Sequence, residues 1–346
     1  MIQLLQPHTV KIYHLEDKEY EVKHVKARSL LSVKRFDIYA KLYYAKYRLS
    51  EPEKALSVYT QHIKAFNPDG KEPGRDDKIT FEAFVNTFNQ LLDYFESNEF
   101  DDSISVVPVD KNGIILDGAH RVAALAFYNK EVTILQFKDV ESKGFFDYQY
   151  FKDRGLKWAI SDVIANEIPQ WHSDILMACL WPQMGDSKCK DKGTEFLKSN
   201  YTICYQKEMA LSLKTIQQLV ARVYASQPWV NQPSSVMDKS VNCYGNSNRT
   251  VRFVMIQSAL SLEETIKCKE FLREMYHSGK HSVHITDNVE ETKVLSQLVL
   301  TAEGISSWNR TGFNNKFLER MKERWYYFKK IEWINLKVRI YKMLHP

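Results

Sequence analysis

A turn, a short apolar strand, a glycine and a His-Arg pair stand directly before a helix-forming run at residues 110–125. Residues 111–113 predict a tight turn, and Ile114 to Leu116 predict a buried strand. The run from Val122 to Ala126 predicts a helix that begins near Gly118. This order constrains the fold, because it places the start of a helix directly after a strand.

The start of such a helix favours a bound phosphate. Its first backbone N–H groups lack partners within the helix, and the positive end of the helix dipole lies there too. Gly118 has no side chain to block a phosphate, Arg121 offers a two-pronged donor, and His120 offers a donor or a proton carrier. The predicted phosphate ligands are Gly118, Ala119, His120 and Arg121. The alternative is a plain hairpin turn at Asp117 and Gly118, followed by a solvated His-Arg pair.

Residues 116–124, Leu-Asp-Gly-Ala-His-Arg-Val-Ala-Ala, and the apolar run at 132–137 resemble the Gly-x-His-Arg element of the ParB/sulfiredoxin superfamily. Residues 20–27 resemble the first strand of that fold and lead into residues 35–41, which would continue the nucleotide or substrate cleft. The resemblance implies an N-terminal ParB/sulfiredoxin-like domain of the α/β (α+β) class. In this superfamily the element holds nucleotide phosphates.

Departures from the superfamily narrow the expected activity. Sulfiredoxins have a reactive cysteine where this sequence has Ala119, so their chemistry is not expected. Chromosome-partitioning ParB proteins have a Glu-Arg-Arg sequence at this turn and a helix-turn-helix domain, and the sequence has neither, so DNA is not an expected partner. The remaining branch contains ATP- or ADP-using kinases of small hydroxyl compounds, typified by free serine kinases. Two alternatives stay open: a ParB-like nucleotide-dependent DNA-binding protein and a non-catalytic assembly factor.

The kinase resemblance implies that ATP or ADP, with Mg²⁺, phosphorylates a hydroxyl of a sugar or amino-acid-like acceptor. Such a transfer needs positive charge around the phosphoryl group and an acidic group that orients or deprotonates the acceptor. Asp117 is the first choice for the base or for a Mg²⁺ ligand, and Asp37 is the second choice for the base. His120 is a further catalytic candidate, and Arg35 and Lys41 are candidate substrate ligands.

Composition indicates a globular protein, with 44% hydrophobic and 13% aromatic residues in a chain of 346. The sequence has no apolar run of about 18 residues and no signal-peptide pattern at its start, so a cytoplasmic protein is expected. Its five cysteines form no Cys-x-x-Cys pair, and free thiols are expected.

Four parts are expected along the chain. Apolar residues at helical spacing between Phe81 and Phe95 predict a packed helix inside the first part. The parts are a ParB-like domain at 1–140 with a helical insertion at about 51–97, a mostly helical region at 141–245, a small α/β unit at 246–310 and a basic amphipathic helix at 311–346.

The third part carries a second group of polar residues. A strand at 251–256, a helix at about 261–277 and a strand before Asp287 follow the βαβ pattern of a parallel layer. Asp287 and Glu290 have the spacing of a helix capping box. Because ligands bind at strand ends in α/β sheets, we expect an acceptor site here. Its residues would be Lys280, His281, His284, Thr286 and Asp287. In its general sequence pattern, this part resembles proteins from bacterial surface-polysaccharide clusters.

The last part is basic. Residues 311–346 contain nine Lys or Arg and three Glu, a net charge of +6. Phe317, Met321, Trp325, Phe328 and Leu336 recur at spacings that fit one face of a helix. Two interpretations stay open: a packed C-terminal helix with solvated lysines, or a helix that binds an acidic partner or an anionic surface at the inner membrane face.

Overall fold

The computed structural model describes residues 1–144, 146–245, 250–309 and 343. The chain divides into two compact units, Met1–Trp171 and His172–Pro346, called here the first and second unit. Both combine helices with a sheet, which confirms the α/β class. The predicted helix at 311–346 lies outside the described residues, apart from Met343. Among the described residues, no helix is long and apolar enough to cross a membrane.

The first unit contains a three-stranded sheet with β3 in the middle. Strand β3 (Glu131–Phe137) pairs antiparallel with β1 (Tyr20–Lys26) and parallel with β2 (Val107–Val109). Tyr20 lies opposite Phe137, and their rings are 5.5 Å apart between centroids. A parallel neighbour requires a crossover connection, and α5 (Ala119–Phe127) provides it between β2 and β3.

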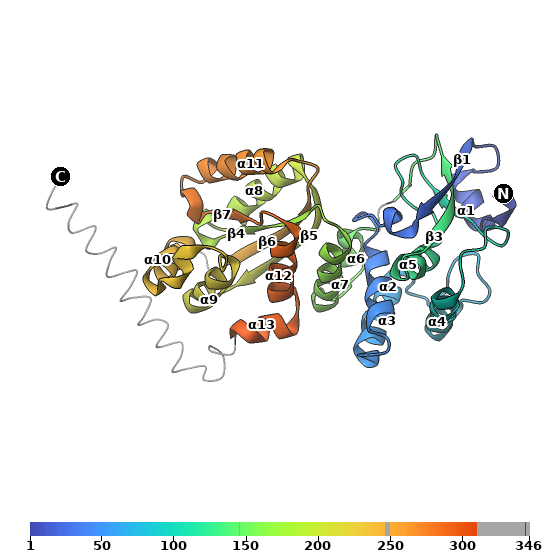
Figure 1. Cartoon of the computed structure of the whole chain (residues 1–346), viewed down its shortest axis with the longest axis horizontal. Coiled ribbons are helices and arrows are strands. Elements are labelled where there is room, and N and C mark those ends of the chain that lie inside the picture. Colours follow the sequence, from blue (N-terminus) through green and yellow to red (C-terminus); the bar gives the residue numbers. More distant parts are fainter. Residues whose placement is uncertain (145, 246–249, 310–342, 344–346) are drawn as a thin grey trace. The chain divides into compact units, whose positions relative to one another are not determined.

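Helices of the first unit lie around α2 (Phe36–Tyr47), in which every residue from Phe36 to Ala45 is buried. The predicted helix in the insertion is present as α4 (Phe81–Ser97), which buries Phe84, Phe88, Leu92 and Phe95. The other helices are α1 (Pro7–Tyr13), α3 (Pro52–Phe66), α6 (Tyr148–Asp153) and α7 (Trp158–Trp171). Figure 1 shows α2, α3 and α5 beside one another in this unit.

The second unit contains a four-stranded antiparallel sheet in the order β5-β6-β4-β7. Its strands are β4 (Ile175–Leu180), β5 (Thr202–Ala210), β6 (Thr250–Gln257) and β7 (Val283–Ile285). Strands β6 and β7 run in the same direction, as the predicted βαβ pattern requires, but the predicted parallel layer is wrong, because β4 lies between them and pairs antiparallel with both. All six residues of β4 are buried, which fits its place inside the sheet.

Helices cover both faces of this sheet (Figure 1). Leu176, Ala178 and Leu180 of β4 point to the face covered by α8 (Ser187–Asn200) and α11 (Leu262–Met275), with which they form a core. The other face packs on α9 (Leu213–Val223), α10 (Pro233–Tyr244) and α12 (Val289–Leu300), and α13 (Ala302–Asn309) follows α12. Short 3₁₀ helices occupy Ile2–Leu4, Ala27–Leu30, Pro182–Met184, Pro228–Asn231 and Gly279–His281.

Strands β4 and β5 lie in the segment 141–245, which the sequence predicted to be mostly helical. Both strands share one sheet with β6 and β7, so the expected boundary at residue 245 would divide that sheet. Helices still make up most of this segment, and the two strands were missed for a physical reason. The continuous apolar run Ile-Leu-Met-Ala-Cys-Leu of β4 lacks the alternation of a half-buried strand, and such a run fits a buried helix equally well.

The cap of α12 is shifted by one residue from its predicted place. Asn288 is the N-cap, and its Oδ1 accepts a hydrogen bond of 2.9 Å from the backbone N–H of Glu291. Glu291 in turn accepts a hydrogen bond of 2.9 Å from the backbone N–H of Asp287. The side chain of Asp287 forms an ion pair with Lys269 instead. The predicted pairing of Asp287 with Glu290 is therefore wrong.

Replacing Asn288 with Ala should lower the free energy of unfolding by about 1 kcal/mol, the usual loss when an N-cap side chain is removed. Glu290→Ala is the matched control, because Glu290 is exposed and pairs only with Lys293 among the described residues. Its effect should stay within about 0.5 kcal/mol. Urea denaturation of the full chain measures both values. A larger loss for Glu290→Ala than for Asn288→Ala would contradict the observed cap.

Candidate functional site

The predicted turn after β2 is present and is held by Asp110. One carboxylate oxygen of Asp110 accepts hydrogen bonds of 2.8 Å from the N–H groups of Asn112 and Ile114. Gly113 has a φ of 83°, a conformation that favours glycine. The predicted strand from Ile114 to Leu116 is wrong, since only Ile115 forms a bridge, with Val109. The carbonyl of Ile115 accepts instead from Arg35 Nη1 at 2.6 Å.

Gly118 sets the start of α5. It is the N-cap residue with a φ of 86°, and its carbonyl accepts the first helical hydrogen bond, from Val122 N–H at 2.9 Å. No side chain caps the helix. Within the described part of the chain, the N–H groups of Ala119, His120 and Arg121 have no hydrogen-bond partner. Three free N–H groups therefore lie at the positive end of the helix dipole.

The guanidinium of Arg121 lies beside Gly118. A Cβ atom added at Gly118 would be 3.0 Å from Arg121 Nη2, so a larger residue would displace this side chain. Nη1 donates to the carbonyl of Val106 at 3.3 Å, and Nη2 is 3.6 Å from a carboxylate oxygen of Asp117. A guanidinium has five N–H donors, so Arg121 keeps donors for an anion at the start of α5.

His120 is neutral and is held in place by Tyr59. Its Nε2 is 2.8 Å from the Tyr59 hydroxyl, which also lies 3.3 Å from the carbonyl of Phe84. Burial, reinforced by the charges of Lys41 and Lys78, lowers the pKa of His120 well below its ordinary value. Burial raises the pKa of Tyr59, so the phenol also stays neutral. His120 can therefore exchange a hydrogen bond with a ligand, but it adds no positive charge before the ligand binds.

Asp37 lies between two buried cations. Arg35 donates to both of its carboxylate oxygens, at 2.8 and 3.0 Å, and Lys41 Nζ donates to one of them at 3.0 Å. Burial alone would raise the pKa of Asp37, but Arg35 and Lys41 outweigh burial and hold this pKa far below its ordinary value. A carboxylate in this state is a poor proton acceptor. This geometry favours Asp37 as a positioning residue over its predicted role as a base.

The loop between α3 and α4 brings charges to the site that the sequence reading missed. Lys78 is buried, pairs with Glu72 at 2.7 Å and lies 5.5 Å from the ring centroid of Phe84. The charge of Arg75 acts on Arg121 and on Asp117. These residues precede the motif by about 40 positions, so no spacing rule linked them to it. The missed residues are Tyr59, Glu72, Arg75 and Lys78.

The carboxylate of Asp117 is partly exposed and lies next to Arg121, and Glu72, which pairs with Lys78, is a second partly exposed carboxylate whose charge acts on Arg121. Among the described residues, no group of three or more His, Cys, Asp or Glu side chains could hold a metal ion alone. Mg²⁺ commonly binds one or two carboxylates together with substrate phosphates and water. Asp117 fits this manner of binding, in which the nucleotide supplies most of the ligands.

The predicted acceptor residues belong to the second unit and do not form one cluster. Lys280 and His281 precede β7, whereas Thr286 and Asp287 follow it, so the two pairs lie at opposite ends of the strand. Thr286 Oγ1 accepts from the N–H of Met177 at 2.9 Å and is 2.7 Å from Thr292 Oγ1. Thr286 therefore has a structural role.

His284 lies within β7, two residues before Thr286, and both residues are buried. Its ring is 4.7 Å from that of Tyr224, and Nε2 has no hydrogen-bond partner in the described part of the chain. Burial, aided by the charge of Lys269, lowers the pKa of His284 to about 3. This residue is a neutral part of the core.

Replacing Asp37 with Asn should lower the free energy of unfolding by about 3–5 kcal/mol, because two buried cations lose their partner. The folded pKa of Asp37 lies below the unfolded value. Its stabilising effect is therefore complete above about pH 4 and declines as the pH falls further. Urea denaturation at pH 7 measures the loss, with Asp117→Asn as control because that carboxylate is partly exposed. Equal losses in the two variants would contradict the structural role of Asp37.

Comparison with known protein families, with curated proteins and with solved structures finds no match for this chain.

Proposed function

We propose that the first unit binds the phosphates of ATP or ADP at the start of α5 and transfers a phosphoryl group to a small hydroxyl compound. One observation carries this proposal: the free N–H groups of Ala119, His120 and Arg121 lie next to a guanidinium and to a glycine without a side chain. An anion with several oxygens satisfies all of these donors at once. A plain hairpin turn followed by a solvated His-Arg pair would leave these donors to water.

Further cations would stabilise the phosphates. The charges of Lys41, Lys78 and Arg75 all act on His120 at the start of α5. Phosphoryl transfer depends on positioning and on charge stabilisation, so cations at this place would stabilise the negative charge on the transferred phosphoryl group. Mg²⁺, held through Asp117 and the phosphates, would neutralise further charge.

Two residues have distinct proposed roles in the transfer. Asp117 orients or deprotonates the acceptor hydroxyl, or holds Mg²⁺, because it is the partly exposed carboxylate beside Arg121. In the tautomer whose Nε2 accepts a hydrogen bond from the Tyr59 hydroxyl, Nδ1 of His120 donates to a phosphate oxygen, and the contact with Tyr59 fixes the ring. A phosphate next to His120 would raise its pKa, so proton transfer becomes available after the nucleotide binds.

The proposed acceptor is a sugar or an amino-acid-like alcohol, and surface polysaccharide biosynthesis is the proposed setting. A cytoplasmic protein fits both donors, ATP and ADP. The test is incubation of the full chain with ATP or ADP, Mg²⁺ and a panel of sugars and hydroxy amino acids, followed by mass spectrometry. A product that is heavier by one phosphoryl group supports the proposal. Nucleotide binding without any product would favour a DNA-binding or assembly role instead.

Arg121→Lys should weaken nucleotide binding by about 1–3 kcal/mol, because an ammonium cannot reproduce the two-pronged contact of a guanidinium. Isothermal titration calorimetry with ATP and Mg²⁺ measures the change. Arg48→Lys is the matched control, since Arg48 is a partly buried arginine paired with Asp93 in the same unit. Unchanged affinity in a folded Arg121→Lys protein would contradict the phosphate site.

A further inference from the structure

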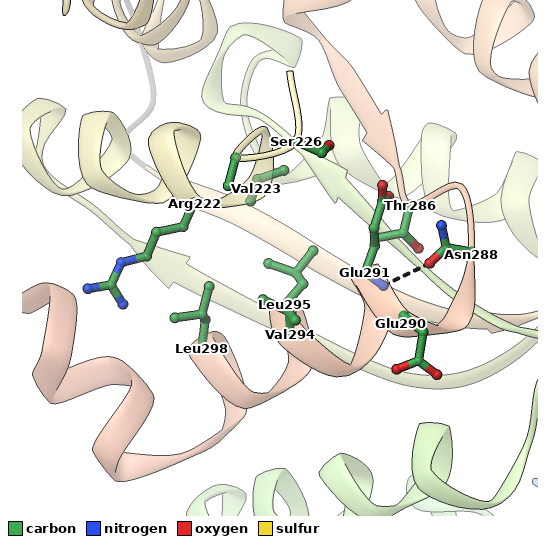
Figure 2. Close-up of a pocket in the computed structure, with 11 residues that line it drawn as sticks. Arg222, Val223, Ser226, Thr286, Asn288, Glu290, Glu291, Val294, Leu295 and Leu298 are labelled. Carbon is green, nitrogen blue, oxygen red and sulfur yellow. Dashed lines mark hydrogen bonds between the residues drawn. The ribbon is translucent and has the colours of Figure 1, made fainter. Parts of the chain in front are cut away.

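The second unit contains a groove of about 350 Å³ between the end of α9 and the length of α12 (Figure 2). Its apolar floor is formed by Val223, Val294, Leu295 and Leu298. Figure 2 shows Arg222 and Leu298 at one end of the groove and Asn288 and Glu290 at the other. Val294 is 55% exposed. The groove therefore offers an apolar strip with an acidic residue at its far end.

The described chain ends beside this groove. Helix α13 follows α12 and contacts α9, and Arg222 Nη1 donates to Ser307 Oγ at 2.6 Å. The remaining chain, from residue 310 onward, therefore leaves near the end marked by Arg222 and Leu298. Seven residues, 310–316, precede the first apolar residue of the amphipathic pattern, and they can span about 23 Å.

The length of the amphipathic pattern matches the length of the groove. Phe317, Met321, Trp325 and Phe328 are spaced as on one helix face, and a helix from 317 to 328 is about 16.5 Å long. From Asn288 to Leu298 the helical rise is about 15 Å. A single apolar face of this segment can therefore cover the whole floor of the groove.

The charges of the segment and of the groove are also complementary. A segment that enters at Leu298 and runs antiparallel to α12 places Lys329 and Lys330 at the end that carries Glu290. The side chain of Glu290 is 75% exposed and pairs with Lys293. It can accept a further cation from the segment. We propose that residues 317–330 of this chain bind the groove between α9 and α12 and cover its apolar floor.

Hydrogen–deuterium exchange of the full chain tests the proposal. Peptides covering residues 317–330 should be protected in the unaltered protein, and Val294→Asp should speed their exchange by about tenfold or more, a factor equivalent to about 1.4 kcal/mol. Leu262→Asp is the matched control, because Leu262 is 57% exposed on α11 and is absent from the groove lining. It should leave the exchange of residues 317–330 unchanged.

A charge exchange tests the orientation of the segment. Glu290→Lys should speed exchange at residues 325–330, and Lys329→Glu with Lys330→Glu should restore protection in the same protein. Failure of this rescue would overturn the antiparallel arrangement. No protection in the unaltered chain, or equal exchange in Val294→Asp and the unaltered protein, would overturn the groove. Protection that arises only with vesicles of phosphatidylglycerol and phosphatidylcholine would assign the segment to an anionic membrane surface instead.

Discussion

The architecture of the site depends on three backbone N–H groups that the helix itself cannot satisfy. Residues 119–121 begin α5 without a capping side chain, and Gly118 precedes them with a positive φ. Most helices cover such groups with a serine, threonine or aspartate side chain. In α5 the N-cap residue is Gly118, and the side chain of Arg121 lies beside it. A glycine in place of a capping residue costs only about a few tenths of a kcal/mol, and an anionic ligand would offset that loss.

Buried ion pairs hold the surroundings of this helix start in place. Arg35 connects Asp37 at the start of α2 with the carbonyl of Ile115, three residues before Gly118. Asp37 also binds Lys41, so one carboxylate neutralises two buried cations only in part. The excess positive charge favours an anion nearby. Burial, together with the charge of Lys41, lowers the pKa of His120, which keeps the imidazole neutral until a ligand arrives.

The sequence predicted the local elements of the site well and the long-range ones poorly. Gly118, the turn at 111–113 and helix α4 follow from short-range turn and helix signals, and the structure contains them. Arg75 and Lys78 were missed because a loop brings them to the site from a distant part of the chain.

In the second unit, too, the sequence did not predict which distant segments lie together. Its sheet order depends on pairings between distant strands, so the position of β4 between β6 and β7 left no local signal. The predicted cluster around His284 relied on closeness in sequence, but β7 separates Lys280 from Asp287.

The most direct test of the central claim is a crystal structure of the full chain with ATP and Mg²⁺. Phosphate oxygens about 2.7–3.1 Å from the backbone nitrogens of residues 119–121 are the predicted result, and phosphates bound elsewhere, with these N–H groups still free, would contradict it.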